Sequence, residues 1–220
     1  MDIQSKETDQ GMDQTRCTRC GTCCEKGGPA LHAEDLDLVM QKKIPAEDLY
    51  TIRRGETVHD NVSGQLMNTP QEIIKLKSAE DTSACIYYDA GQKACRIYDI
   101  RPLECRLMAC WDTGPLEAAY ETDRLERESL FGSLDWLMDL IRTHEEKCGY
   151  ERIAALVEKR QFKDAGAGED ILEAVRYDTE MRRVVQEKAG MGEGMLDLIF
   201  GRPLGKTIPV QFGIKLVRNS

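Results

Sequence analysis

The cysteine positions constrain this chain more than any other feature of the sequence. Four cysteines fall within eight residues, CTRCGTCC, in which the first three are spaced three apart and the fourth follows directly. A second group comes later in the first half of the chain, and one cysteine stands alone near residue 150. The first group is Cys17, Cys20, Cys23 and Cys24, the second is Cys85, Cys95, Cys105 and Cys110, and the lone residue is Cys148.

The spacing of the first group leaves two kinds of metal site open. Thiolates are soft donors that select Zn²⁺, Cu(I) or iron–sulfur clusters over Mg²⁺ and Ca²⁺. In one interpretation CTRCG is a zinc knuckle, in which Gly21 takes the left-handed conformation and frees backbone N–H groups to face sulfur. In the other, Cys17, Cys20 and Cys23 resemble the run that holds a 4Fe–4S cluster with a fourth ligand from elsewhere. We favour iron–sulfur, because the triple run exceeds the needs of one zinc knuckle.

The doubled cysteine bears on the number of sites. Adjacent side chains diverge, so Cys23 and Cys24 are not expected to bind one small ion together. One of them would serve a second site or remain a free thiol. Eight cysteines could complete two four-sulfur sites, or one cluster with spare thiols. We therefore expect all eight to be candidate metal ligands, whereas Cys148 is expected to be a half-buried structural thiol.

Composition limits the partners and the location that we expect. The chain has 220 residues and a formal net charge of −9, which argues against binding to nucleic acid or to an anionic membrane surface. No apolar run is long enough to span a bilayer, and the N-terminus lacks the apolar segment of a signal peptide. We expect a cytoplasmic protein with an unidentified protein or redox partner. Thiols stay reduced there, which favours metal ligands over disulfides.

The residue pattern changes along the chain and predicts three regions. Residues 1–15 are polar and are expected to form a disordered leader, residues 16–112 a cysteine-cluster metal-binding module, and residues 113–220 a mainly helical region. The predicted fold class is α+β, with a small cysteine-rich metal-binding module packed on a mainly helical C-terminal half.

Local patterns within these regions predict particular elements. A short β-hairpin is expected over residues 84–99, because two β-prone runs flank a turn at Asp89-Ala90-Gly91. A short helix is expected over 45–54, which begins with proline and acidic residues. The segment 205–217 carries β-prone residues, although Pro209 argues against a central strand.

The two cysteine segments together resemble a known family. CTRCGTCC, followed by the cysteine at 85 and CRIYDIRPLEC, is similar to the zinc- or iron-chelating cysteine-cluster family named for its CxxCxxCC signature. Besides cysteines, the likeness is carried by Tyr98, Arg101 and Pro102, and Cys110 resembles a further family cysteine. It covers about residues 15–112.

The resemblance implies a metal or iron–sulfur site and, besides a metal chaperone, leaves three functions open. One is an iron–sulfur protein with a redox role, since members are often labelled oxidoreductases. Another is a structural zinc-binding interaction module, in which metal folds a loop-rich segment. The third is an enzyme that modifies protein side chains, since the related flagellin lysine methylases share the cysteine signature. No catalytic residue is assigned.

Arg101 is the candidate cofactor-binding residue outside the cysteines. Its guanidinium could donate hydrogen bonds to thiolates or hold an acidic substrate group. The alternative is an ordinary ion pair with Asp99 or Glu104. The histidines are weaker candidates for metal ligands than the cysteines. His32, His59 and His144 lack the spacing of paired ligands and are expected to be surface or capping residues.

Overall fold

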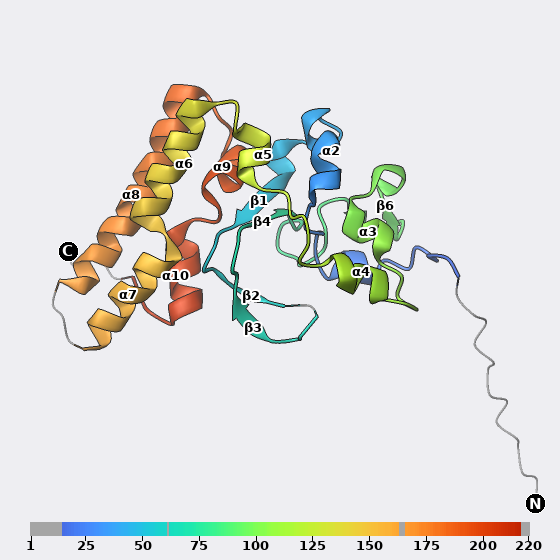
Figure 1. The fold of residues 1–220 in the computed structure, drawn as a ribbon, viewed down its shortest axis with the longest axis horizontal. Helices are drawn as coiled ribbons and strands as arrows, with labels where there is room; N and C mark the ends of the chain where they lie inside the picture. Colours follow the sequence, from blue (N-terminus) through green and yellow to red (C-terminus); the bar gives the residue numbers. More distant parts are fainter. Residues whose placement is uncertain (1–14, 61, 163–165, 217–220) are drawn as a thin grey trace, which may run out of the picture.

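The computed structural model describes residues 15–60, 62–162 and 166–216. All of the expected leader except residue 15 lies outside these ranges. Short helices and small sheets of the first half occupy one side of the molecule, and the long helices of the second half occupy the other (Figure 1). The mixed class of helices and strands is therefore confirmed.

Short elements build the first half. In chain order they are α1 (Thr22–Glu25), η1 (Ala33–Asp35), α2 (Leu36–Met40), η2 (Ala46–Asp48), β1 (Leu49–Ile52), β2 (Thr57–His59), β3 (Leu66–Asn68), β4 (Ile73–Leu76), β5 (Tyr88–Asp89), β6 (Ala94–Cys95), η3 (Tyr98–Ile100) and α3 (Leu103–Leu107). The strands form three antiparallel pairs, β1 with β4, β2 with β3, and β5 with β6. The last pair confirms a hairpin within residues 84–99, with Tyr88 opposite Cys95, but the second β-prone run is not a strand, because Tyr98 begins the 3₁₀ turn η3.

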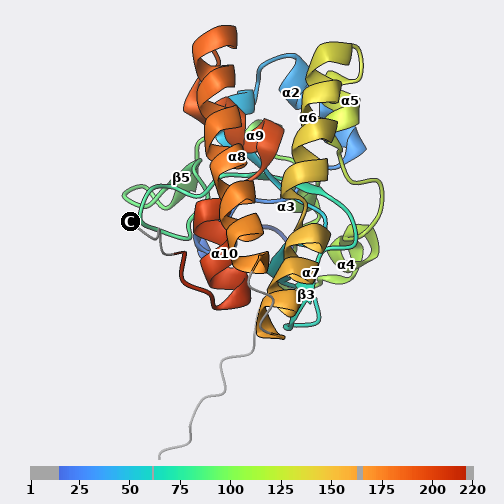
Figure 2. The ribbon, with the colours of Figure 1, turned by 90° about the vertical axis from the view of Figure 1, so that its left-hand side faces the viewer.

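Helices build the second half. They are α4 (Gly114–Ala119), α5 (Arg127–Phe131), α6 (Asp135–Cys148), α7 (Tyr150–Gln161), α8 (Ala167–Ala189), α9 (Glu193–Phe200) and α10 (Leu204–Phe212). Helix α8 packs along α6 and α7, and α10 lies beside it (Figure 2). In the ranges that the structure describes, no helix combines the length and apolar character needed to cross a membrane.

Two expected elements are wrong. The helix expected over 45–54 is one 3₁₀ turn followed by strand β1, because residues 49–52 pair with β4 and bury Leu49 and Ile52. The β-prone segment near the C-terminus is helix α10, which contains Pro209. Its buried residues Leu204 and Ile208 are four apart and so lie on one helical face.

One hydrophobic core joins the two halves of the chain. Leu49 and Ile74 from the β1–β4 sheet and Leu198 from α9 are all fully buried in the same cluster. The Thr51 hydroxyl donates a hydrogen bond of 2.6 Å to the Leu198 carbonyl. Cys85 is buried in this cluster too. The core that supports the cysteine segments is therefore shared with the helical half, and the expected boundary at residue 112 stays a prediction.

A buried polar network ties α6 to α8. Asp178 accepts hydrogen bonds of 2.9 Å from His144 Nε2, Arg182 Nε and the Leu204 N–H. Burial alone would raise the pKa of Asp178, but the His144 hydrogen bond and the Arg182 charge outweigh it and lower the pKa. Burial lowers the pKa of His144. His144 is fully buried and is not the surface residue that we expected.

Candidate metal centre

The first cysteine group lies in a loop and the single helical turn α1. Cys17, Cys20 and Cys23 are exposed, and Cys24 is half-buried. Gly21 has φ 85°, so the predicted left-handed conformation is confirmed, and Arg19 is left-handed as well. The backbone N–H of Arg19 donates to Cys17 Sγ at 3.4 Å. Left-handed turns of this kind aim backbone N–H groups at anionic sulfur.

Backbone hydrogen bonds hold this segment against the second cysteine group. The N–H of Cys85 donates to the Cys24 carbonyl at 2.7 Å. The Ser83 hydroxyl donates to the Glu25 carbonyl at 2.8 Å, and the Tyr88 hydroxyl reaches the Glu25 carboxylate at 3.2 Å. Two segments far apart in the sequence therefore present their thiols to a common region.

Five thiols share this region, and we refer to them as the five-cysteine cluster. They are Cys23 and Cys24 from α1, Cys85 from the loop between β4 and β5, Cys95 from β6 and Cys105 from α3. Burial and the nearby charges of the other four raise the pKa of Cys105. Burial, with contributions from Cys23, Cys95 and Cys85, raises the pKa of Cys24 to about 12. A cation that binds these thiols would displace their protons and relieve the repulsion between thiolates.

Cys23 and Cys24 lie closer together than expected. Their sulfur atoms are 4.0 Å apart, so the expected divergence of these adjacent side chains is wrong. Two thiolates bound to one tetrahedral zinc ion would be about 3.8 Å apart. Both sulfurs can therefore face the same centre.

The remaining candidate ligands lie outside this cluster. Cys17, Cys20 and Cys110 are exposed, and a hydrogen bond with the Thr22 hydroxyl lowers the pKa of Cys20. In the chain as described, no three His, Cys, Asp or Glu side chains form a group that could hold a metal ion as they stand. The structure thus gathers thiols without closing a coordination shell, and ligation by each of the eight cysteines stays a prediction.

Glu104 anchors the helix that carries Cys105, and the sequence did not identify this role. Its carboxylate accepts hydrogen bonds from the Ala30 N–H at 2.8 Å and from Arg124 Nη1 at 2.7 Å. His32 Nε2 lies 3.4 Å from the same group, while His32 itself caps η1, which confirms a capping role. Burial would raise the pKa of Glu104, but the His32 hydrogen bond and the Arg124 charge lower it. The charged carboxylate therefore fixes α3.

Arg101 does not form the ion pair that we considered as an alternative. Its guanidinium stacks on the Tyr98 ring, with Cζ 3.6 Å from the ring centroid. Among the residues with described positions, neither Asp99 nor any other carboxylate is an ion-pair partner of Arg101, and Glu104 pairs with Arg124. The guanidinium therefore remains a candidate for binding a ligand.

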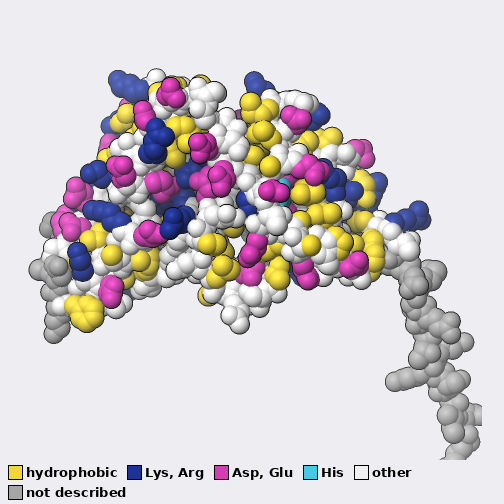
Figure 3. Space-filling model, in the orientation of Figure 1, with side chains coloured by type: hydrophobic (Ala, Val, Ile, Leu, Met, Phe, Trp, Pro, Cys, Tyr) yellow, Lys and Arg dark blue, Asp and Glu magenta, His cyan; other side chains and the backbone are white. Residues whose placement is uncertain are grey.

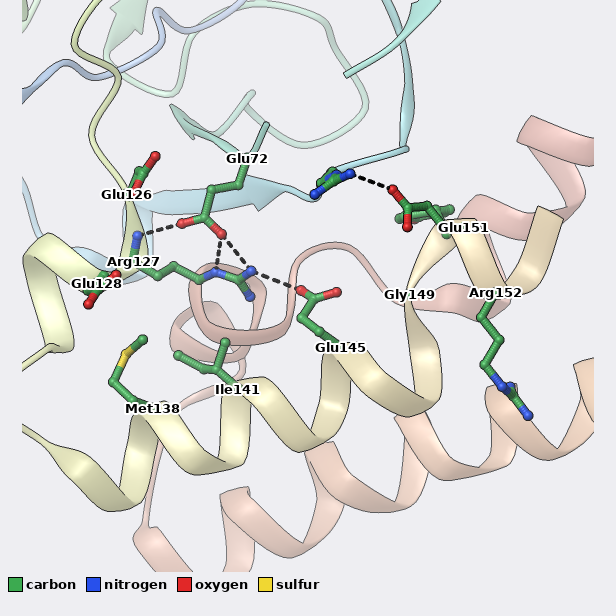
Figure 4. A pocket seen from close by; sticks show the side chains of 12 residues that line it. Glu72, Glu126, Arg127, Glu128, Met138, Ile141, Glu145, Gly149, Glu151 and Arg152 are labelled. Atoms are coloured by element: carbon green, nitrogen blue, oxygen red, sulfur yellow. Dashed lines mark hydrogen bonds and ion pairs between the residues drawn. The ribbon is translucent and has the colours of Figure 1, made fainter. Parts of the chain in front are cut away.

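A separate cleft of about 490 Å³ opens between the start of β4, helix α5 and the α6–α7 junction. No cysteine is among its lining residues. Arg127 reaches across it to Glu72 and Glu145, with N–O distances of 2.6 and 2.8 Å, as Figure 4 shows. Arg54 and Glu151 form a further pair at 2.8 Å. Because these charged side chains pair with one another, they connect the sheet to the helices and do not indicate which ligand the cleft would bind.

Gly21 offers a test of the cysteine loop. A Cβ added there would lie 2.6 Å from Tyr88 Cζ, on a residue with positive φ. We expect Gly21→Ala to weaken metal binding about tenfold or more, because the loop must move away from the second segment. Gly64→Ala is the control, since Gly64 also has positive φ but a Cβ there would meet nothing within 4 Å. Equal metal affinity of both variants, measured by chelator competition, would contradict the expectation.

The five-cysteine cluster defines the class of the chain as a cysteine-cluster protein. Comparison with family models places it more narrowly. The chain belongs to the CxxCxxCC family, described as a zinc- or iron-chelating domain, which matches residues 16–129. Metal binding is accordingly the function that the family supports. The match extends past the expected residue 112 and includes Arg124, the partner of Glu104. No curated protein and no solved structure matches the chain.

Proposed function

We propose that the five-cysteine cluster, together with Cys17, Cys20 and Cys110, supplies the thiolate ligands for iron–sulfur, either as two four-cysteine sites or as one cluster with spare thiols. The observation that carries the proposal is that Cys24, Cys85 and Cys105, which come from separate segments, all have a raised pKa to which neighbouring cysteines contribute. The gathered side chains are thiols, and the nearby Glu104 is engaged with Arg124. This donor set suits iron–sulfur or zinc and does not suit Mg²⁺ or Ca²⁺.

The first cysteine segment favours iron–sulfur over zinc. Its three-residue spacing is one that would supply three ligands to one centre. The Arg19 N–H already bonds Cys17 Sγ, in a left-handed turn that would suit a zinc knuckle as well. N–H groups aimed at sulfur stabilise the negative charge of such clusters.

A bound iron–sulfur cluster would supply one-electron transfer. The chain would position it through α1 and α3, the latter fixed by Glu104. Cys17, Cys20 and Cys110 are each exposed, so a cluster that they help to bind would be accessible to a redox partner in a reducing compartment such as the cytoplasm.

Structural zinc is the second candidate. The 4.0 Å between the sulfurs of Cys23 and Cys24 suits two ligands of one small ion. In this case the metal would order the loops and present a surface to a partner protein.

Anaerobic purification of the full chain, followed by metal and sulfide analysis and a visible spectrum, separates the two candidates. We expect iron and acid-labile sulfide in equal amounts and a brown colour that bleaches on reduction with dithionite. Colourless protein that contains zinc and no iron would overturn the iron–sulfur proposal and support structural zinc. Protein without either metal, after reconstitution with each, would overturn both.

A further inference from the structure

The small sheet formed by β2 and β3 has one edge covered and the other edge open. Thr57, the first residue of β2, donates its backbone N–H to Gln211 Oε1 of α10 at 3.0 Å. Gln211 Nε2 in turn donates to the Gly55 carbonyl at 2.9 Å. Helix α10 therefore covers the outer edge of β2. In the part of the chain that the structure describes, no strand pairs with the outer edge of β3.

The register of the two strands shows which backbone groups of β3 point outward. The Thr69 N–H donates to the Glu56 carbonyl at 3.0 Å, so these two residues form a hydrogen-bonded pair. In an antiparallel sheet such pairs alternate with pairs whose N–H and C=O groups point away from the partner strand. Leu66 and Asn68 are at these outward positions. Among the described residues, none forms a hydrogen bond with the backbone of either one.

This edge lacks the charged side chains that usually protect an exposed strand from pairing with another chain. Residues 61–71 are the longest stretch of the sequence without a charged residue, although 31% of all residues are charged. Leu66 is 74% exposed, and Val62 in the connecting loop is 53% exposed. The hairpin projects from the lower edge of the molecule in Figure 1, and the surface at its tip is white and yellow in Figure 3, the colours of uncharged groups.

The length of the open edge is limited at both ends. Pro70 is at the next outward position after Asn68, and it has no N–H to donate. Before Leu66, the N–H of Gly64 is already bonded within the turn at 2.8 Å. The edge therefore offers the backbone groups of two residues, Leu66 and Asn68, with Met67 between them.

We propose that β3 pairs with β3 of a second copy of this chain, antiparallel and around a two-fold axis at Met67. Leu66 of each copy then lies opposite Asn68 of the other, and each of these pairs exchanges two backbone hydrogen bonds. The symmetric register uses the outward groups of both edges, as in other cases of strand addition. It also suits the charge of the chain. Two copies with a net charge of −9 repel each other, and this segment adds no charged side chain to the contact.

Sedimentation velocity of the full chain over a range of protein concentrations tests the proposal, and we expect a monomer–dimer equilibrium. Leu66→Lys places a charge on the edge and should weaken dimerisation about tenfold or more. Asn68→Pro should also weaken it, because proline removes an outward N–H that β2 does not use. Amide hydrogen exchange should slow at Leu66 and Asn68 as the protein concentration rises. The N–H of Met67, which faces β2, should change little.

Leu134→Lys is the matched control, because Leu134 is an exposed leucine that precedes α6 and lies outside the strands. It should dimerise as the wild type does. The melting temperature of each variant is compared with that of the wild type, and Leu66→Lys decides the question if Asn68→Pro does not fold. A wild type that stays monomeric at every concentration would overturn the proposal, and the edge would then be left to a strand of another protein. Equal dimerisation of Leu66→Lys and Leu134→Lys would also overturn it, because the copies would then meet at another surface.

Discussion

Cys105→Ser should lose most of its bound metal and melt about 5 °C or more below the wild type when both are purified with metal. The other four members of the five-cysteine cluster all contribute to the raised pKa of the Cys105 thiol. Its helix is fixed by Glu104, so a neighbouring cysteine cannot easily replace it. Because binding a metal to loops also folds them, the loss of one ligand should appear in both metal content and thermal stability.

Cys148→Ala is the control for this substitution. Cys148 is fully buried, not half-buried as expected, in a second hydrophobic cluster that α7, α8 and α10 form around it, and its thiol donates to the Ala174 carbonyl at 3.5 Å. Burial raises its pKa to about 12. The variant should keep its metal and lose stability only by the small cavity that it creates. A Cys105→Ser protein with full metal content would exclude Cys105 as a ligand.

Asp178→Ala should destabilise the protein by about 3–5 kcal/mol, the cost of breaking a buried ion pair. The carboxylate accepts three hydrogen bonds between α6, α8 and the start of α10. Without it, His144 and Arg182 lose a buried partner, and the Leu204 N–H is left without an acceptor. Denaturant unfolding of the metal-free chain measures this loss apart from any change in metal binding.

Asp139→Ala is the matched comparison, because Asp139 is also an aspartate in an ion pair but lies on the exposed side of α6. Asp139 forms an exposed ion pair with Arg142, one turn away on α6. Exposed pairs of this kind contribute little, so the variant should unfold close to the wild type. Similar unfolding of the Asp178 and Asp139 variants would mean that the buried network does not stabilise the fold as the hydrogen bonds imply.

Features that depend on neighbouring residues were predictable from the sequence. The left-handed Gly21 follows from the cysteine turn, and the hairpin follows from two β-prone runs around Gly91. The mixed fold class follows from the patterns of the separate segments, and the family follows from two cysteine segments that are far apart in the sequence. For the turn and the hairpin, the signal and the structure lie within a few residues of each other.

Features that depend on distant residues were not predictable. Residues 49–52 look helical beside their acidic start, but they become a strand because β4 pairs with them. The partner of Glu104 is Arg124 and not its near neighbour Arg101. The short distance between the sulfurs of Cys23 and Cys24 was missed for a different reason: it depends on the helical turn α1, which the two cysteines alone do not predict.

The contact between β1 and α9 can form only late in synthesis of the chain. All eight candidate ligands are synthesised before α9, which covers the β1–β4 sheet and bonds Thr51 through Leu198. Contacts between such distant positions form late, because a long loop must close first. A nascent first half therefore offers thiols but lacks the covered sheet that supports them. We therefore expect the cysteines to bind metal more tightly once α9 has been synthesised.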